Sequence, residues 1–173
     1  MRIAYTKHHN EGQISPERDT AIAVSGSSTH QYAEDITIEG NYIEGFSYKG
    51  IIIGGYVRDV WVVNNVIKNM KLLDLSWTPD AIAVGGVNVE RVHIIGNKII
   101  NSEYRGLFIS NKEICVEGNQ IYYSGDYPIW IDNGDFITVR DNYIYGAALI
   151  GPQSGSGINV KEGKHIIIFK GRT

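Results

Sequence analysis

The sequence contains little leucine and little cysteine, and each shortage limits the fold. Only 5 of the 173 residues are Leu, against 27 Ile and 13 Val. β-branched side chains lose rotamer freedom in a helix but pack well on a pleated surface. The composition therefore argues against a helical bundle or a coiled coil, because both are rich in Leu and Ala. It predicts an all-β protein instead. The single cysteine, Cys115, excludes an internal disulfide.

Further absences narrow the partners. The chain has 16 basic and 19 acidic residues without a concentrated basic footprint, so we expect no nucleic acid partner. No apolar run approaches the roughly 18–20 residues of a transmembrane helix, so we expect no membrane partner. The segment from Met1 to His9 lacks an apolar core of signal-peptide length, so we expect no signal peptide in this chain.

What the sequence does contain is a repeat. Its core is an apolar-x-apolar segment, two further residues and then Asn-x-Ile, as in the stretch from Ile36 to Ile43. The Asn recurs with spacings of 24, 32, 22 and 23 residues, at Asn41, Asn65, Asn97, Asn119 and Asn142. A sixth copy, from Ile166 to Gly171, has Gly in the Asn place. Another short apolar segment precedes each copy, so each repeat is expected to hold three short strands.

The alternation of apolar residues predicts how the repeats pack. Strands alternate side chains between two faces, and the same alternate positions are apolar in every repeat, such as Ile36 and Ile38. One coil cannot bury that face alone, whereas stacked coils bury a continuous column and bond each strand to its equivalents. The recurrent Asn then falls at the bend before the third strand, where stacked amides can form an asparagine ladder.

A second file of residues supports the same register. Seven residues before the Asn position, the sign of the charge alternates from coil to coil, at Glu34, Arg58, Glu90, Lys112, Asp135 and Lys164. Neighbouring coils would lie about 4.8 Å apart, so opposite charges attract and a slip of one coil would bring like charges together. We interpret this file, and the pair of Glu117 with Arg140, as register control.

These tandem Gly-Asn-x-Ile coils resemble the right-handed parallel β-helix proteins of the pectate-lyase-like superfamily, which includes polysaccharide lyases and bacteriophage tailspikes. The resemblance covers roughly residues 21 to 171. It implies an all-β solenoid of about six coils with three short strands per coil. It says little about activity, since one fold hosts many functions.

The ends of the chain both fall within a coil. We expect residues 1–20 to form a partial preceding coil and a loop, with Arg2 to Tyr5 as its third strand, and residues 21–173 to form the β-helix. This arrangement fits a fragment of a longer protein, or ends that a partner or a neighbouring domain covers.

A trough is expected where short connections lie between long ones. Residues 7–20, 69–80 and 146–156 are long connections into a first strand, whereas residues 101–105 and 123–127 are short. The floor of this trough would carry Glu103, Tyr104, Arg105, Tyr123, Asp126 and Tyr127. On the adjoining first strands, one equivalent position in each coil faces outward. This outward file would consist of Ala23, Ile52, Ala83, Phe108, Trp130 and Asn159. Ser110, Asp132 and Lys161 would follow it two residues later on their strands.

Aromatic side chains beside carboxylates suit sugars, whose C–H faces are apolar and whose edges need hydrogen bonds. The candidate polysaccharide-binding residues are Asp74, Trp77, Tyr104, Arg105, Tyr123, Tyr127, Trp130 and Asp132. Lateral packing against long loops or a neighbouring chain would enrich aromatic residues equally, and the sequence leaves both interpretations open.

Three carboxylates are candidates for catalysis. Asp80, Glu103 and Asp126 lie near one corner of three successive coils, within reach of the separations of about 5–9.5 Å that glycosidases use. The sequence lacks the Asp-Asp, Gly-His-Gly and Arg-Ile-Lys motifs of polygalacturonases, and Arg105 is the only basic residue low in the trough for a lyase. We predict no cofactor and no metal site. Whether the protein is an enzyme, a polysaccharide hydrolase or lyase, stays open.

We therefore expect a carbohydrate-recognising module. It would be the glycan-binding or glycan-cleaving body of a tailspike-like surface protein, outside the cell or on a virion. The alternative is a structural shaft without catalytic activity, whose aromatic face packs in a homo-oligomer such as a trimer.

Overall fold

The computed structural model describes residues 1–4, 6–9, 20–28, 31–71, 79–147 and 157–169. These residues form β-strands, turns and bends, and they include no helix. No helix able to cross a membrane is therefore found in the described ranges. The prediction of an all-β chain is confirmed for this part of the protein.

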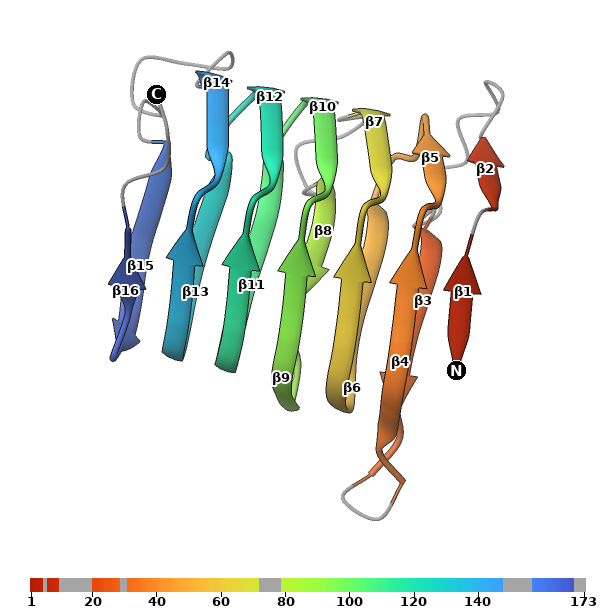
Figure 1. The fold of residues 1–173 in the computed structure, drawn as a ribbon, viewed down its shortest axis with the longest axis vertical. Coiled ribbons are helices and arrows are strands. Elements are labelled where there is room, and N and C mark those ends of the chain that lie inside the picture. Colours follow the sequence, from red (N-terminus) through yellow and green to blue (C-terminus); the bar gives the residue numbers. More distant parts are fainter. Residues whose placement is uncertain (5, 10–19, 29–30, 72–78, 148–156, 170–173) are drawn as a thin grey trace.

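The strands stack in three parallel files, and Figure 1 shows them side by side from β1 at one end to β15 and β16 at the other. The first-strand file consists of β3 (Thr20–Gly26), the start of β6 (Lys49–Val63), β8 (Asp80–Val84), the starts of β11 (Arg105–Glu117) and β13 (Ile129–Arg140), and β15 (Ile158–Lys164). The second-strand file consists of β1 (Arg2–Ala4), β4 (Ala33–Glu39), the end of β6, β9 (Asn88–Ile95), the ends of β11 and β13, and β16 (Ile167–Ile168). The third-strand file is a separate six-stranded sheet of β2 (Lys7–His9), β5 (Tyr42–Glu44), β7 (Val66–Met70), β10 (Lys98–Ser102), β12 (Gln120–Ser124) and β14 (Tyr143–Ala147).

The core is a column of aliphatic side chains inside the stack. In the first strands Ile51, Ile82 and Leu107 stand in register and are fully buried. The third strands add Ile67, Ile99 and Ile121, which are in register and buried as well. Burying one such side chain contributes about 1.5–3 kcal/mol, so the column holds the coils together. The predicted parallel β-helix is confirmed.

Three details differ from the sequence prediction. The first and second strands are continuous in β6, β11 and β13, because a β-bulge or a left-handed residue turns the corner without ending the hydrogen-bonded ladder. The described residues give five complete coils, which start at β3, β6, β8, β11 and β13, where six were expected. The prediction that Arg2 to Tyr5 form a third strand is wrong for the described residues Arg2–Ala4, because they pair with the second strand β4.

The reason for this last error is that Thr6 takes the place of an Asn in the first partial coil. Its backbone N–H and its hydroxyl both donate to Asn41 Oδ1, at 3.1 and 2.7 Å. Asn41 in turn donates to the carbonyl of Ile3 at 3.0 Å, as Asn65 donates to Ile38 in the next coil. The third strand of that coil is β2, which pairs with β5.

The asparagine ladder is confirmed. From Asn65 through Asn142, each Asn side-chain oxygen accepts from the backbone N–H and the side-chain amide of the Asn one coil before, at 2.9–3.0 Å. The same amide donates to a carbonyl at the end of a second strand, as Asn97 does to Val62 at 2.8 Å. The ladder is buried, so it satisfies backbone groups that the bend would otherwise leave without partners.

Left-handed backbone turns each coil at fixed places. One file lies six residues before the Asn position of each coil, at Asp35, Asp59, Arg91, Glu113, Phe136 and His165. A second file directly precedes the Asn ladder, at Gly40, Asn64, Gly96, Gly118 and Asp141. A third file lies four residues after the ladder, at Gly45, Asn69, Asn101, Tyr123 and Gly146. Most members are Gly, Asn or Asp, the residues that tolerate this conformation best.

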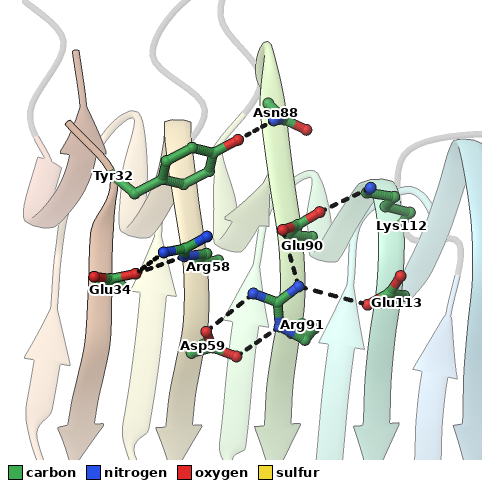
Figure 2. A network of polar contacts seen from close by, with 9 residues as sticks. All are labelled: Tyr32, Glu34, Arg58, Asp59, Asn88, Glu90, Arg91, Lys112 and Glu113. Carbon is green, nitrogen blue, oxygen red and sulfur yellow. Dashed lines mark hydrogen bonds and ion pairs between the residues drawn. The ribbon is translucent and has the colours of Figure 1, made fainter. Parts of the chain in front are cut away.

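The predicted charge file also stands in register, and every neighbouring pair in it has opposite sign. Arg58 lies 2.5 Å from Glu34, and Lys112 lies 2.8 Å from Glu90 (Figure 2). Arg91, one residue further on, donates two bonds to Asp59 at 2.7 and 3.0 Å and one to Glu90 at 2.9 Å. The second predicted pair, Glu117 with Arg140, lies at 2.7 Å. These contacts support register control.

Replacing Asn97 with Ala should lower the free energy of unfolding by about 2–4 kcal/mol, because buried donors and acceptors on two neighbouring coils lose their partners. Urea denaturation measures this loss. The control is Asn101→Gly, at an exposed position of the third file of left-handed residues, where Gly45 and Gly146 adopt the same backbone, and it should cost less than about 1 kcal/mol. Equal losses in the two variants would contradict a stabilising role for the buried ladder.

Glu90 makes the stability depend on pH. Its pKa lies below the ordinary value, first because Lys112 donates to the carboxylate and also because Arg91 does. A depressed pKa contributes stability that is present above the unfolded-state pKa, about 4.3, and is lost as the pH falls through the folded-state pKa. Glu90→Gln should therefore lose less stability than the wild type on acidification below about pH 5. Melting temperatures across this range give the answer, and parallel acid profiles for both proteins would refute it.

Candidate functional site

Three charged side chains stand in register where the first strands begin. Lys49 pairs with Asp80 along the stack, and Asp80 pairs with Arg105. Lys49 Nζ lies 2.5 Å from Asp80 Oδ2, and Arg105 Nε lies 2.7 Å from Asp80 Oδ1. The Asp80 side chain is 1% exposed and that of Lys49 is 6% exposed. This buried group therefore holds two cations around one carboxylate.

The Arg105 guanidinium lies among aromatic rings. Its central carbon is 4.6 Å from the ring centre of Phe108, 4.8 Å from that of Tyr104 and 5.8 Å from that of Trp130. Tyr127 packs on Trp130 with 4.7 Å between ring centres. Cation–π attraction fixes the arginine within this aromatic group, and the group extends from the corner onto the outward face of the first strands.

A hollow with a volume of about 320 Å³ opens beside this group. It is lined by Tyr48, Lys49, Ile52, Asp80, Ala83, Gly85, Gly86, Arg105, Phe108 and Ser110. The hollow exists because Ala83 stands in the outward file between two larger residues, Ile52 and Phe108. Gly85 keeps it open, since a Cβ there would lie 3.1 Å from the Phe108 ring.

The next coil adds a tyrosine–carboxyl pair. The backbone N–H of Asp126 donates to the Tyr104 carbonyl at 2.7 Å, and both side chains are half-buried. Burial raises the pKa of Asp126, while the charge of Arg105 and the neighbouring Tyr104 hydroxyl act in the opposite direction. Burial also raises the pKa of Tyr104. The raised pKa of Asp126 makes a protonated carboxyl more accessible than at an exposed aspartate.

The contacts thus join several of the predicted site residues into one group. Arg105, Tyr104, Asp126, Trp130 and Tyr127 are linked by the contacts above. Of the remaining predicted residues, Glu103 is exposed, Asp132 lies 3.4 Å from Lys161, and Tyr123 lies beside Tyr145 with 5.6 Å between ring centres. Asp74 and Trp77 lie outside the described residues.

Asp80 differs from a carboxylate that faces a substrate, because both of its oxygens already bind cations of the protein. It was predicted as one of three catalytic candidates on one corner, and it does line the hollow. Its two oxygens, however, are already held by Lys49 and Arg105 inside the stack. A carboxylate held by two buried cations is suited to anchoring those cations.

Lys49 was not singled out from the sequence. It stands two residues before the inward Ile51, as Asp80 stands before Ile82 and Arg105 before Leu107. That shared offset is the signal that places all three in register. The outward file that was predicted, from Ala23 to Asn159, is confirmed by the strand pairing.

Comparison with known proteins supports the fold. A family model described as a right-handed β-helix region matches residues 80–172, which is more than half of the chain. The chain belongs to the right-handed β-helix family. No curated protein and no solved structure matches it. The match agrees with the predicted hand of this β-helix and leaves its activity open, since folds of this kind host unrelated functions.

In the part of the chain that the structure describes, no three His, Cys, Asp or Glu side chains gather in a way that could hold a metal ion.

Asp80→Asn should be strongly destabilising, by about 3–5 kcal/mol, because it leaves the buried Lys49 and the largely buried Arg105 without their carboxylate. The matched control is Asp132→Asn, whose ion-pair partner Lys161 is 54% exposed, and the expected cost there is below about 1 kcal/mol. Chemical denaturation compares the two variants. An Asp80→Asn protein as stable as the wild type would show that the buried ion group does not support the fold.

Proposed function

We propose that this β-helix is a carbohydrate-recognising module and that a sugar unit of a polysaccharide occupies the hollow over Ala83. The observation that carries the proposal is a hollow of about 320 Å³ with an aromatic wall and a charged end on a rigid strand face. Its size lies at the lower end of the range for small-ligand sites, about 300–1,000 Å³. That range suits a short stretch of a glycan.

The chemistry of the walls supports a sugar. Phe108 presents an apolar ring to the hollow, and Ile52 and Ala83 add apolar floor. Apolar C–H faces of a sugar pack on such rings. Lys49, Arg105 and Ser110 carry the donors that sugar hydroxyl or acidic groups require, at the rim of the same hollow.

The rigidity of the scaffold supports recognition as well. The lining residues lie on β6, β8 and β11 or directly beside these strands, which are hydrogen-bonded to one another. A site built on strands loses little freedom when a ligand binds, so more of the contact energy appears as affinity. The setting that we propose is a surface protein of the tailspike type, outside the cell or on a virion.

Glycan cleavage would use Asp126 as the general acid. Asp126 is not part of the lining of the hollow and is connected to it through Tyr104 and Arg105. A general acid for glycoside hydrolysis needs a raised pKa, and burial raises the pKa of Asp126. Asp126→Asn should then abolish depolymerisation while leaving polysaccharide binding in place. Binding without any depolymerisation by the wild type would limit the module to recognition.

Binding can be tested with a substitution that fills the hollow. Ala83→Leu should weaken retention on soluble β-glucan, xylan, amylose or polygalacturonate at least tenfold, because the added side chain occupies the space of the sugar. Ala23→Leu is the control: Ala23 stands in the same outward file but is exposed and lies outside the hollow. Affinity electrophoresis in these polysaccharides compares the variants with the wild type.

Two results would overturn this proposal. One is a wild-type protein that binds none of the polysaccharides on a glycan array. The other is a trimer in sedimentation analysis that buries Phe108 and Trp130 between chains, with Trp130→Ala affecting only assembly. Either result would favour the structural shaft.

A further inference from the structure

One residue departs from the pattern of the third left-handed file. Gly45, Asn69, Asn101 and Gly146 are residues that adopt this backbone readily, but the fourth member in chain order is Tyr123, with φ at 57°. A bulky side chain at such a φ is a genuine outlier and carries backbone strain. The stack holds Tyr123 in a conformation that the residue itself does not favour.

Burial of the ring does not offset this backbone strain, because the ring is exposed. The Tyr123 side chain is 42% exposed, although its neighbours Ile121 and Ser124 on β12 are buried. By contrast, the equivalent Asn residues bond along the stack, with Asn101 donating to Asn69 at 3.2 Å and Asn69 donating to Glu44 at 2.8 Å. An Asn at position 123 would continue that row of bonds with less strain.

The surroundings hold the ring in one place. Tyr123 meets Tyr145 edge-on, with 5.6 Å between ring centres and planes at 85°. Gly146 makes the space: a Cβ on this residue would lie 2.6 Å from Cδ1 of Tyr123. One side of the ring therefore lies over the Gly146 backbone, and Tyr145, itself 54% exposed, supports its edge.

The same two coils expose further tyrosines. Tyr122 and Tyr143 are neighbours on β12 and β14, with 5.7 Å between ring centres, and Tyr143 is 37% exposed. Four tyrosines therefore gather on two adjacent third strands. Their flat rings with hydroxyl rims offer stacking and hydrogen bonds without charge, which is the chemistry that carbohydrates need.

We propose that Tyr123 and Tyr145 form a second sugar contact of the same binding site, on the third-strand side of the corner. This inference rests on the proposed function, because it extends the glycan from the hollow. Tyr123 precedes Tyr127 by four residues, so their Cα atoms lie at most about 14 Å apart. A glycan that enters the hollow beside Phe108 passes over Tyr127 and Trp130 and stacks on Tyr123, across the coils.

Tyr123→Asn tests this placement. It restores the residue type of Asn69 and Asn101, so the melting temperature should rise as the strain is relieved. Binding of the hexamers of glucose, xylose and galacturonate (cellohexaose, maltohexaose, xylohexaose and the galacturonic acid hexamer) should weaken about fivefold or more in calorimetry, for whichever of them the wild type binds. Binding of the corresponding trimers, which fill only the hollow, should stay unchanged.

Phe136→Asn is the matched control. Phe136 is another aromatic residue in left-handed backbone, with φ at 52°, and it is 55% exposed. It lies at the corner between first and second strands, where it stacks on His165 with 4.5 Å between ring centres. This variant should also melt at a higher temperature, but its affinity for the hexamers should equal that of the wild type.

The outcomes separate the two proposals. If Ala83→Leu loses hexamer binding and Tyr123→Asn retains it, the second contact is overturned and the hollow stands. If Tyr123→Asn loses hexamer binding and Ala83→Leu retains it, the hollow is overturned instead. A wild type that binds none of the hexamers overturns both, and equal losses for trimers and hexamers in Tyr123→Asn contradict a separate contact.

Discussion

Hydrogen bonding between equivalent strands of neighbouring coils is the interaction on which the rest of this structure depends. One coil has an apolar inner face that it cannot cover, so each coil is stable only with another above or below it. The parallel pairing fixes every residue opposite its counterpart, about 4.8 Å away. The buried asparagine ladder then serves as the register mark, because a slip by one residue would leave amides and backbone groups inside the bend without partners.

This constraint decides where function can lie. Inward positions must repeat, which explains why Ile fills file after file, since identical environments favour the same side chain. Outward positions can differ from coil to coil, and the candidate site consists of residues that differ from the other members of their file. Ala83 between two larger residues makes the hollow, Asp80 between two cations makes the ion group, and Tyr123 among Gly and Asn makes the exposed platform. Each departs from its file, and each is held in place by the regularity around it.

The same constraint explains what could be predicted from the sequence. The files of Ile, Asn and alternating charge were readable because neighbours along the stack are separated by one repeat. The membership of the outward file, with Phe108 beside Trp130, followed for the same reason. Contacts around a corner were not readable, because they depend on how far a side chain reaches after the turn. Lys49 was overlooked although its offset from Ile51 places it in register with Asp80. The closeness of Arg105 to three rings could not be read from the sequence. The second strand at Arg2 was misassigned because Thr6 replaces the Asn that marks the bend.

Burial then separates residues that support the site from residues that can meet a ligand. Asp80 is buried with both oxygens held, so in the proposed recognition it would act through the position of Lys49 and Arg105. Asp126, Trp130 and Tyr127 are half-buried at the same corner and keep exposed surface. Tyr123 and Tyr145 are more exposed still, and they lie on a different sheet of the same coils. A ligand that uses both surfaces must cross the corner, so its length decides how many of these contacts it makes. Recognition by this β-helix would therefore depend on glycan length as well as on the chemistry of a single sugar unit.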